Sequence, residues 1–173
     1  AKLYSYTAGI KTRLFDNHLQ INDEAFYYIY RDLLLQAYNV GAPVNTIFNA
    51  NRVLIWGNQL DISWKPTAND SITAYVSYLH NRNDDFIDPT TNISYNGLAG
   101  PYSADWTVGA NAYHDFQMTR GYVRLQADAR FESAWFADFV HNPGTRQQPY
   151  VKANASLVYH EQNERWSLGV WCR

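Results

Sequence analysis

The stretch VRLQADARFE, residues 123–132, decides the fold because apolar and polar residues alternate along it without a break. The odd positions hold valine, leucine, two alanines and phenylalanine, and the even positions hold arginine, glutamine, aspartate, arginine and glutamate. Successive side chains of a β-strand point to opposite faces of its sheet. The stretch therefore predicts a strand with one apolar face and one charged face.

The same alternation recurs along most of the chain, although it is less regular between residues 18 and 30. The full set of segments that carry it comprises residues 4–14, 18–30, 54–64, 72–78, 106–116, 123–131, 151–159 and 166–170. We therefore predict an all-β, antiparallel protein of about eight up-and-down strands.

The connections between these segments alternate between two lengths. Tight polar turns are predicted at residues 15–17, 66–70, 117–121 and 161–164, and long connections rich in Asn, Asp, Gly and Pro at residues 32–51, 81–103 and 137–149. Short turns at one end of the strands and long loops at the other are typical of the two ends of a transmembrane β-barrel. The pattern therefore predicts a segment of such a barrel.

Aromatic residues, 16% of the chain, support a membrane barrel. The rings near the tight turns are Trp64, Phe116, Tyr159 and Trp166, and those toward the long connections are Tyr4, Tyr6, Trp56, Tyr78 and Trp106. Amphipathic rings collect at the two membrane interfaces, so two girdles are expected. The alternative is ordinary packing of rings in a soluble core.

Composition excludes several classes of protein. No apolar run approaches the roughly 20 residues that a helical membrane span needs, and the net charge of −2 argues against a nucleic-acid-binding surface. A single cysteine, Cys172, excludes a disulfide framework. The five histidines are scattered without metal-ligand spacing, so we predict no metal site, no cofactor and no enzyme activity.

Five segments carry a resemblance to a known family. They are YSYTAGIKTRLFDNHLQIN at residues 4–22, AFYYIYRDL at 25–33, WGNQLDISWKPTANDSITAYVSYL at 56–79, HNPGTRQQPYVKANASLVY at 141–159 and RWSLGVW at 165–171. In this order they resemble the C-terminal half of the β-barrel of TonB-dependent outer-membrane receptors, which include siderophore receptors.

The resemblance implies a domain organisation. Residues 1–173 would be a partial barrel domain belonging to a barrel of about 22 strands with a plugged lumen. The plug domain, the early strands and the final strand would be absent from this sequence, and both of its ends are expected to be interior to a longer chain.

The resemblance also implies a function. The protein would reside in the bacterial outer membrane, in contact with its lipid, and import a scarce small-molecule ligand such as a ferric siderophore or similar iron complex. Transport would be energised by the TonB complex, which engages the missing plug domain. No nucleic acid is expected as a partner.

Two sets of residues are candidates for the binding site. Ligand-binding candidates in the extracellular loops are Tyr95, Tyr102, His141 and Arg146, because aromatic rings and a cation suit a planar or anionic chelate. Possible plug contacts on the lumen-facing side are Arg124, Asp128, Arg130 and Glu132. The alternatives are that the first set packs or hydrates the loops and that the second forms a solvated wall with mutual ion pairs.

Asp23 departs from the alternation, because Leu19, Ile21, Ala25 and Tyr27 place it on the apolar face. A carboxylate in the middle of a bilayer is costly. We therefore expect either a β-bulge that shifts the register at Asp23 or a position near a membrane interface, and protonation is a third interpretation.

Two other fold hypotheses remain open at the level of the sequence. One is a small, closed eight-stranded membrane barrel acting as an adhesin or an enzyme, in which the first and eighth strands pair. The other is a soluble lipocalin-like binding barrel, whose apolar side chains line the interior.

Overall fold

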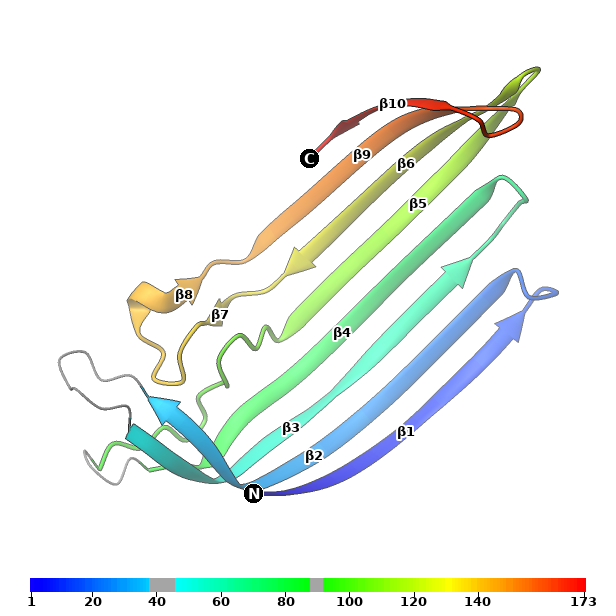
Figure 1. Cartoon of the computed structure of the whole chain (residues 1–173). Coiled ribbons are helices and arrows are strands. Elements are labelled where there is room, and N and C mark those ends of the chain that lie inside the picture. The colour runs from blue at the N-terminus through cyan, green and yellow to red at the C-terminus, as the bar shows by residue number, and fades with distance from the viewer. Residues whose placement is uncertain (38–45, 88–91) are drawn as a thin grey trace.

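In a computed structural model, which describes residues 1–37, 46–87 and 92–173, the chain forms one long antiparallel sheet of eight strands (Figure 1). The strands are β1 (Lys2–Leu14), β2 (Leu19–Ala37), β3 (Thr46–Trp64), β4 (Asp70–Asp85), β5 (Trp106–Met118), β6 (Gly121–Glu132), β9 (Tyr150–Glu161) and β10 (Ser167–Cys172). They pair in chain order from β1 to β10, so the predicted up-and-down, all-β arrangement is confirmed.

The long connection between β6 and β9 folds back on itself. It contains a two-stranded hairpin of β7 (Trp135–Phe136) and β8 (Arg146–Gln147), with the short 3₁₀ helix η1 (Pro143–Thr145) between them. The 3₁₀ helix and β8 lie inside the segment predicted as loop, residues 137–149, and β7 lies just before it. Within the described ranges, no helix is long and apolar enough to cross a membrane.

The tight turns gather at one end of the sheet and the long connections at the other, as predicted (Figure 1). The predicted loop boundaries at residues 32–51 and 81–103 are wrong, because β2 continues to Ala37, β3 begins at Thr46 and β4 continues to Asp85. Backbone pairing holds these extensions, with Leu33 opposite Ala50, although apolar and polar residues no longer alternate in the sequence there. Residues 38–45 and 88–91 of those loops lie outside the described part.

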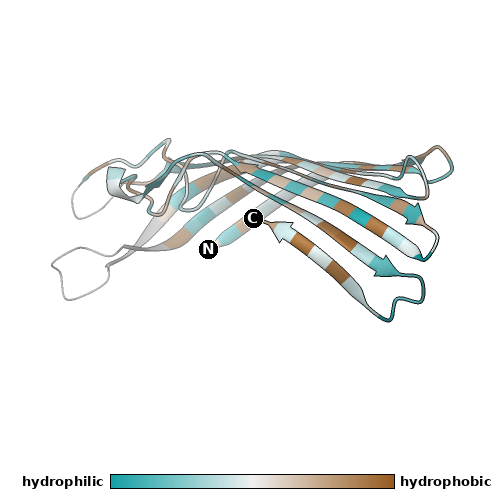
Figure 2. Cartoon of the chain, turned by 90° about the horizontal axis from the view of Figure 1, so that it is seen from above, coloured by the Kyte–Doolittle hydropathy of each residue, from teal (hydrophilic) through white to brown (hydrophobic). Residues whose placement is uncertain are grey.

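The register collects the apolar residues of all strands on one side, which we call the apolar face. Pairing runs without a shift from Leu19 opposite Trp64 to Arg31 opposite Arg52, and directly paired residues share a face. Hydrophobic and hydrophilic residues alternate along the strands (Figure 2). Many apolar side chains on this face are exposed, Ile10 at 69% and Leu168 at 72%, because no second layer of described residues covers them.

Aromatic rings on the apolar face form rows near both ends of the strands. Toward the long connections, the ring centroids of Trp56 and Tyr78 are 5.5 Å apart, and those of Tyr78 and Trp106 are 4.7 Å apart. At the tight-turn end, Tyr159 and Trp166 lie 5.3 Å apart. These positions agree with the two predicted clusters of rings.

The sheet is open, with β1 and β10 as its two edges. Both alternative hypotheses, the closed eight-stranded membrane barrel and the lipocalin-like barrel, require a closed sheet. The described residues do not form one. A larger barrel, to which this sheet contributes a part of the wall, fits the same topology.

On the opposite side, which we call the polar face, aromatic rings lie against glycines of the next strand. A Cβ atom at Gly109 would lie 2.4 Å from Cε1 of Tyr75, which is its cross-strand partner. A Cβ at Gly57 would lie 2.8 Å from the Phe26 ring and 2.0 Å from the backbone oxygen of Tyr78. Glycine is therefore required at Gly57, where backbone and ring both leave no room.

A small hydrophobic core lies at the long-connection end. Ala50 and Val53 of β3 pack with Phe86 and Phe139, which come from two different connections. The partly buried residues around them are Tyr30, Leu33, Ile55 and Tyr95. The connections are thereby packed onto the outer ends of β2 and β3.

The structure contradicts both favoured interpretations of Asp23. Its register is unshifted, with Ile10 of β1 and Leu60 of β3 as direct partners, so there is no bulge. It lies four residues from Leu19 and four from Tyr27, midway between the two rows of rings. The Asn58 side chain donates a hydrogen bond of 2.8 Å to its carboxylate, which partly satisfies the group without bending the strand.

Candidate functional site

Three of the four loop candidates surround the β7–β8 hairpin. The backbone N–H of Tyr102 donates to the carbonyl of Phe136 at 2.8 Å, and the Tyr102 ring lies 5.1 Å from that of Trp135. The His141 ring stacks on Phe136 at 4.1 Å, and Arg146 is the cross-strand partner of Phe136. Residues separated by up to 44 positions thus meet at one hairpin.

Tyr95, the fourth candidate, lies apart from this group. Its ring packs 5.2 Å from Phe86 and 5.6 Å from Phe139, against the small hydrophobic core. This position agrees with the alternative that Tyr95 packs the loops.

The hairpin group offers two exposed side chains to a ligand. Tyr102 is 69% exposed and Arg146 is exposed, whereas His141 is half-buried, with Nε2 3.0 Å from the carbonyl oxygen of Ala99. A guanidinium binds planar anions through two parallel N–H donors, and a phenol adds a hydrogen bond and an aromatic surface. The group therefore has the chemistry to bind an anionic or aromatic chelate.

Arg124 lies on the polar face and is held by its neighbours. Its Nε and one terminal nitrogen donate to the two carboxylate oxygens of Asp115 at 2.7 and 2.8 Å. Its guanidinium carbon lies 4.1 Å from the centre of the Tyr113 ring. A bidentate pair packed on an aromatic ring fixes the guanidinium, so Arg124 links β5 to β6 in the wall.

The other three wall candidates also lie on the polar face, nearer the long connections. Arg130 donates to Glu132 at 2.7 Å, and the Tyr150 hydroxyl donates to the same carboxylate at 3.0 Å. Asp128 accepts a 2.7 Å hydrogen bond from the Asn154 amide. The mutual ion pair foreseen as the alternative is present for Arg130 and Glu132, and the Arg130 side chain remains 54% exposed.

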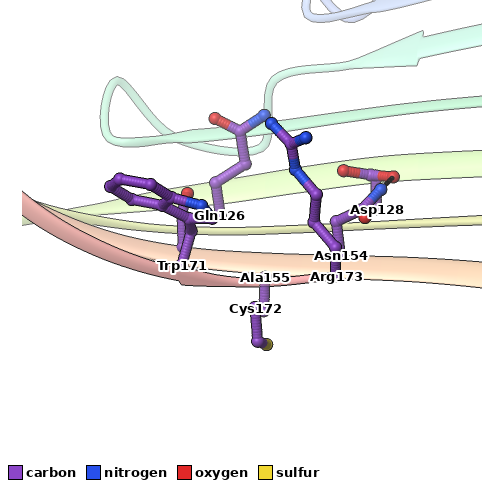
Figure 3. A pocket seen from close by; sticks show the side chains of 8 residues that line it. Gln126, Asp128, Asn154, Ala155, Trp171, Cys172 and Arg173 are labelled. Carbon is purple, nitrogen blue, oxygen red and sulfur yellow. Dashed lines mark hydrogen bonds between the residues drawn. The ribbon is translucent and has the colours of Figure 1, made fainter.

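An open groove of about 470 Å³ runs along β6, β9 and β10 beside Asp128 (Figure 3). Gln126, Asn154 and Trp171 point to one side of the sheet, and Ala155 and Cys172 point to the other. Trp171 is not among the candidates predicted from the sequence, because it follows Leu168 and Val170 and looks like one more apolar residue of the strand. The register places it opposite Ser156, on the polar face. The polar part of its lining, which includes Gln126 and Asn154, lies on the same face as the wall candidates.

Sequence reasoning also missed a polar cluster at the outer end of β4. Arg82 donates to both carboxylate oxygens of Asp105 at 2.9 and 2.8 Å, and the Asn81 amide donates to the Ser103 hydroxyl at 2.7 Å. Both contacts join β4 to the connection that leads to β5. No spacing in the sequence relates these residues, so the fold alone reveals the cluster.

Comparisons with known proteins identify what the chain is similar to. Residues 2–173 match the sequence model of a family described as TonB dependent receptor-like, beta-barrel. No curated protein sequence matches.

Solved structures resemble the sheet at low sequence identity. The siderophore receptor PiuA from Acinetobacter baumannii has a TM-score of 0.71 at 18% identity, covering 91% of this chain and 22% of its own. The ferric yersiniabactin uptake receptor FyuA from Yersinia pestis has a TM-score of 0.70 at 17% identity, covering 92% and 24%. The copper transporter OprC has a TM-score of 0.65 at 13% identity, covering 91% and 23%. The chain therefore spans about a quarter of the length of these structures, and their likeness shows the fold.

Proposed function

Because the chain belongs to the family of TonB-dependent receptor-like β-barrels, we propose that the protein containing it is an outer-membrane receptor that imports a scarce ligand by active transport. The observation that carries this proposal is the uncovered apolar face, with rows of rings near both ends and a polar face behind it. An apolar surface of this kind is unfavourable in water. It is favourable when the apolar face contacts lipid and the polar face lines the lumen of a barrel.

The proposed organisation follows from the coverage of the similar structures. The eight strands would be part of a barrel of about 22 strands, and a plug domain that engages TonB would lie elsewhere in the protein. Arg124 would then hold the wall together, whereas Asp128, Arg130 and Glu132 would face the plug. The greater exposure of Arg130 makes it the best placed of these side chains to reach a plug residue.

The proposed ligand is a ferric siderophore or a similar iron complex. Two of the similar structures are a siderophore receptor and a ferric yersiniabactin uptake receptor, and their names favour iron. The similarity to a copper transporter makes copper the alternative metal. Tyr102, His141 and Arg146 would contact the ligand at the β7–β8 hairpin.

The test is ligand uptake by the complete receptor in cells that lack their own siderophore receptors. We expect radioactive iron to enter with at least one class of siderophore, catecholate, hydroxamate or carboxylate, and to stop entering when TonB is deleted. Uptake that persists without TonB, or entry of copper alone, would contradict the proposal.

The loop site has a matched pair of variants in the same assay. Arg146→Ala should weaken binding of an anionic complex roughly tenfold, because a charge-assisted hydrogen bond is lost. Arg165→Ala removes the same charge near the tight turn at the opposite end of the sheet and should leave binding unchanged. Equal effects of the two variants would remove Arg146 from the site while leaving the transport proposal standing.

A further inference from the structure

Three cations lie side by side on the apolar face, at the end that carries the long connections. Lys2 of β1 is directly opposite Arg31 of β2, and Arg31 is directly opposite Arg52 of β3. Both pairings belong to unshifted ladders, so the three residues share the face of the exposed apolar side chains. We call Lys2, Arg31 and Arg52 the basic row.

The basic row lies a fixed distance beyond a row of rings. Tyr6, Tyr27 and Trp56 are direct partners on the same three strands, and each is four residues from the cation of its own strand. Four residues span about 13 Å of strand. In a membrane barrel the rings mark the edge of the hydrocarbon, so the row would stand at the level of the polar headgroups.

The charges of the row are only partly compensated. Arg52 forms an ion pair with Asp84, whereas Arg31 lies 5.8 Å over the ring of Tyr4. Within the described ranges, no carboxylate forms an ion pair with Arg31 or Lys2, and both residues are exposed. Like charges directly opposite one another destabilise a sheet, so this row gains from an anion that bridges it.

An open groove lies beside the row. Its volume is about 500 Å³, and its lining includes Arg31, Arg52 and the amide of Asn51. Asp32 of β2 and Asp84 and Asp85 of β4 also line it, so its three carboxylates outnumber its two guanidiniums. We therefore expect an anion at the Lys2 and Arg31 end of the row, where the two cations are direct partners, rather than in the groove.

We propose that the basic row binds a phosphate of a glycolipid headgroup in the outer leaflet. A guanidinium matches a phosphate through two parallel hydrogen bonds, the lysine ammonium adds a point charge, and the acyl chains would lie over the exposed apolar residues below. This inference rests on the proposed membrane orientation but does not depend on transport or on the identity of the imported ligand.

The test measures lipid binding by the complete receptor, purified in a neutral detergent, with diphosphorylated lipid A as the probe. Native mass spectrometry gives the binding and thermal unfolding gives the stabilisation. We expect lipid A to bind and to raise the unfolding temperature. The double variant Lys2→Gln with Arg31→Gln should bind about tenfold more weakly, because two cations at the phosphate are lost.

The matched control is Lys11→Gln with Arg13→Gln, which removes two cations from the polar face of β1 and should bind as the wild type does. A second measurement needs only the wild type: lipid A stripped of its phosphates should lose its stabilising effect, and inorganic phosphate at the same concentration should not replace it. Equal binding by both double variants, equal binding of dephosphorylated lipid, or full replacement by inorganic phosphate would each overturn the proposal. Failure of transport with normal lipid A binding would instead count against the proposed function alone.

Discussion

At the scale of single residues, Asp23 is a carboxylate placed on the apolar face midway between the two rows of rings, with one hydrogen bond from Asn58. Polar groups on the lipid face destabilise a barrel most near the middle of the bilayer. Replacing Asp23 by leucine should therefore raise the stability of the complete receptor by on the order of 1 kcal/mol, less than the cost measured for basic residues at that depth. Asn58 keeps a second acceptor, the carbonyl of Glu24 at 3.2 Å.

The measurement is the free energy of unfolding in lipid vesicles by urea titration. Asp61→Leu is the control, since Asp61 lies on the polar face of β3 and gains nothing from an apolar replacement. A loss of stability in Asp23→Leu would show that the hydrogen bond from Asn58 outweighs the cost of a carboxylate on the apolar face.

At the scale of elements, the connections after β4 and β6 are held by packing rather than by extended pairing. Phe86 is fully buried and contacts Phe139 with ring centroids 5.6 Å apart. Phe86→Ala should remove about 3 to 5 kcal/mol of local packing and release these connections, while the strands remain folded. Limited proteolysis should then cut residues 92–103 and 137–149 much faster than in the wild type.

Phe15→Ala provides the comparison, because Phe15 is 73% exposed in the turn between β1 and β2. Its proteolysis pattern should match that of the wild type. Loss of the whole barrel in Phe86→Ala, judged by the heat-induced shift in electrophoretic mobility, would mean that the core of the loops is needed for the strands themselves.

The strands were predictable from the sequence where lipid and lumen impose a two-residue period, as in residues 123–132. Outside that region the period disappears, which is why the sequence missed the extension of β2 from Asp32 to Ala37 and the two-residue strands β7 and β8. Backbone hydrogen bonds continue there without a constraint on side-chain polarity.

The candidate site was predictable only as a set of residue types. The side-chain chemistry of Tyr102 and Arg146 identifies them as candidates. Their proximity in space depends on a backbone hydrogen bond from Tyr102 to Phe136, the cross-strand partner of Arg146, and no sequence pattern predicts that bond. The basic row was missed for a different reason: Lys2, Arg31 and Arg52 become neighbours only through the register between three strands.

At the scale of the whole molecule, both edge strands carry unpaired backbone groups on their outer sides, because among the described residues β1 pairs only with β2 and β10 only with β9. In lipid or detergent each such group costs several kcal/mol. We therefore expect residues 1–173, expressed without further strands, to aggregate rather than to form a stable monomer. Electrophoresis without heating tests this, and a sharp, heat-modifiable monomeric band would contradict the expectation.

In the described part of the chain, each strand of the main sheet is hydrogen-bonded only to its predecessor and its successor in that sheet, from β1 through β6 to β9 and β10. Such a meander can be laid down one hairpin at a time, with the newest strand always serving as the template for the next. No earlier strand has to be reopened to admit a later one. The topology therefore allows the wall to be assembled strand by strand along the chain, with one exposed edge extended at a time.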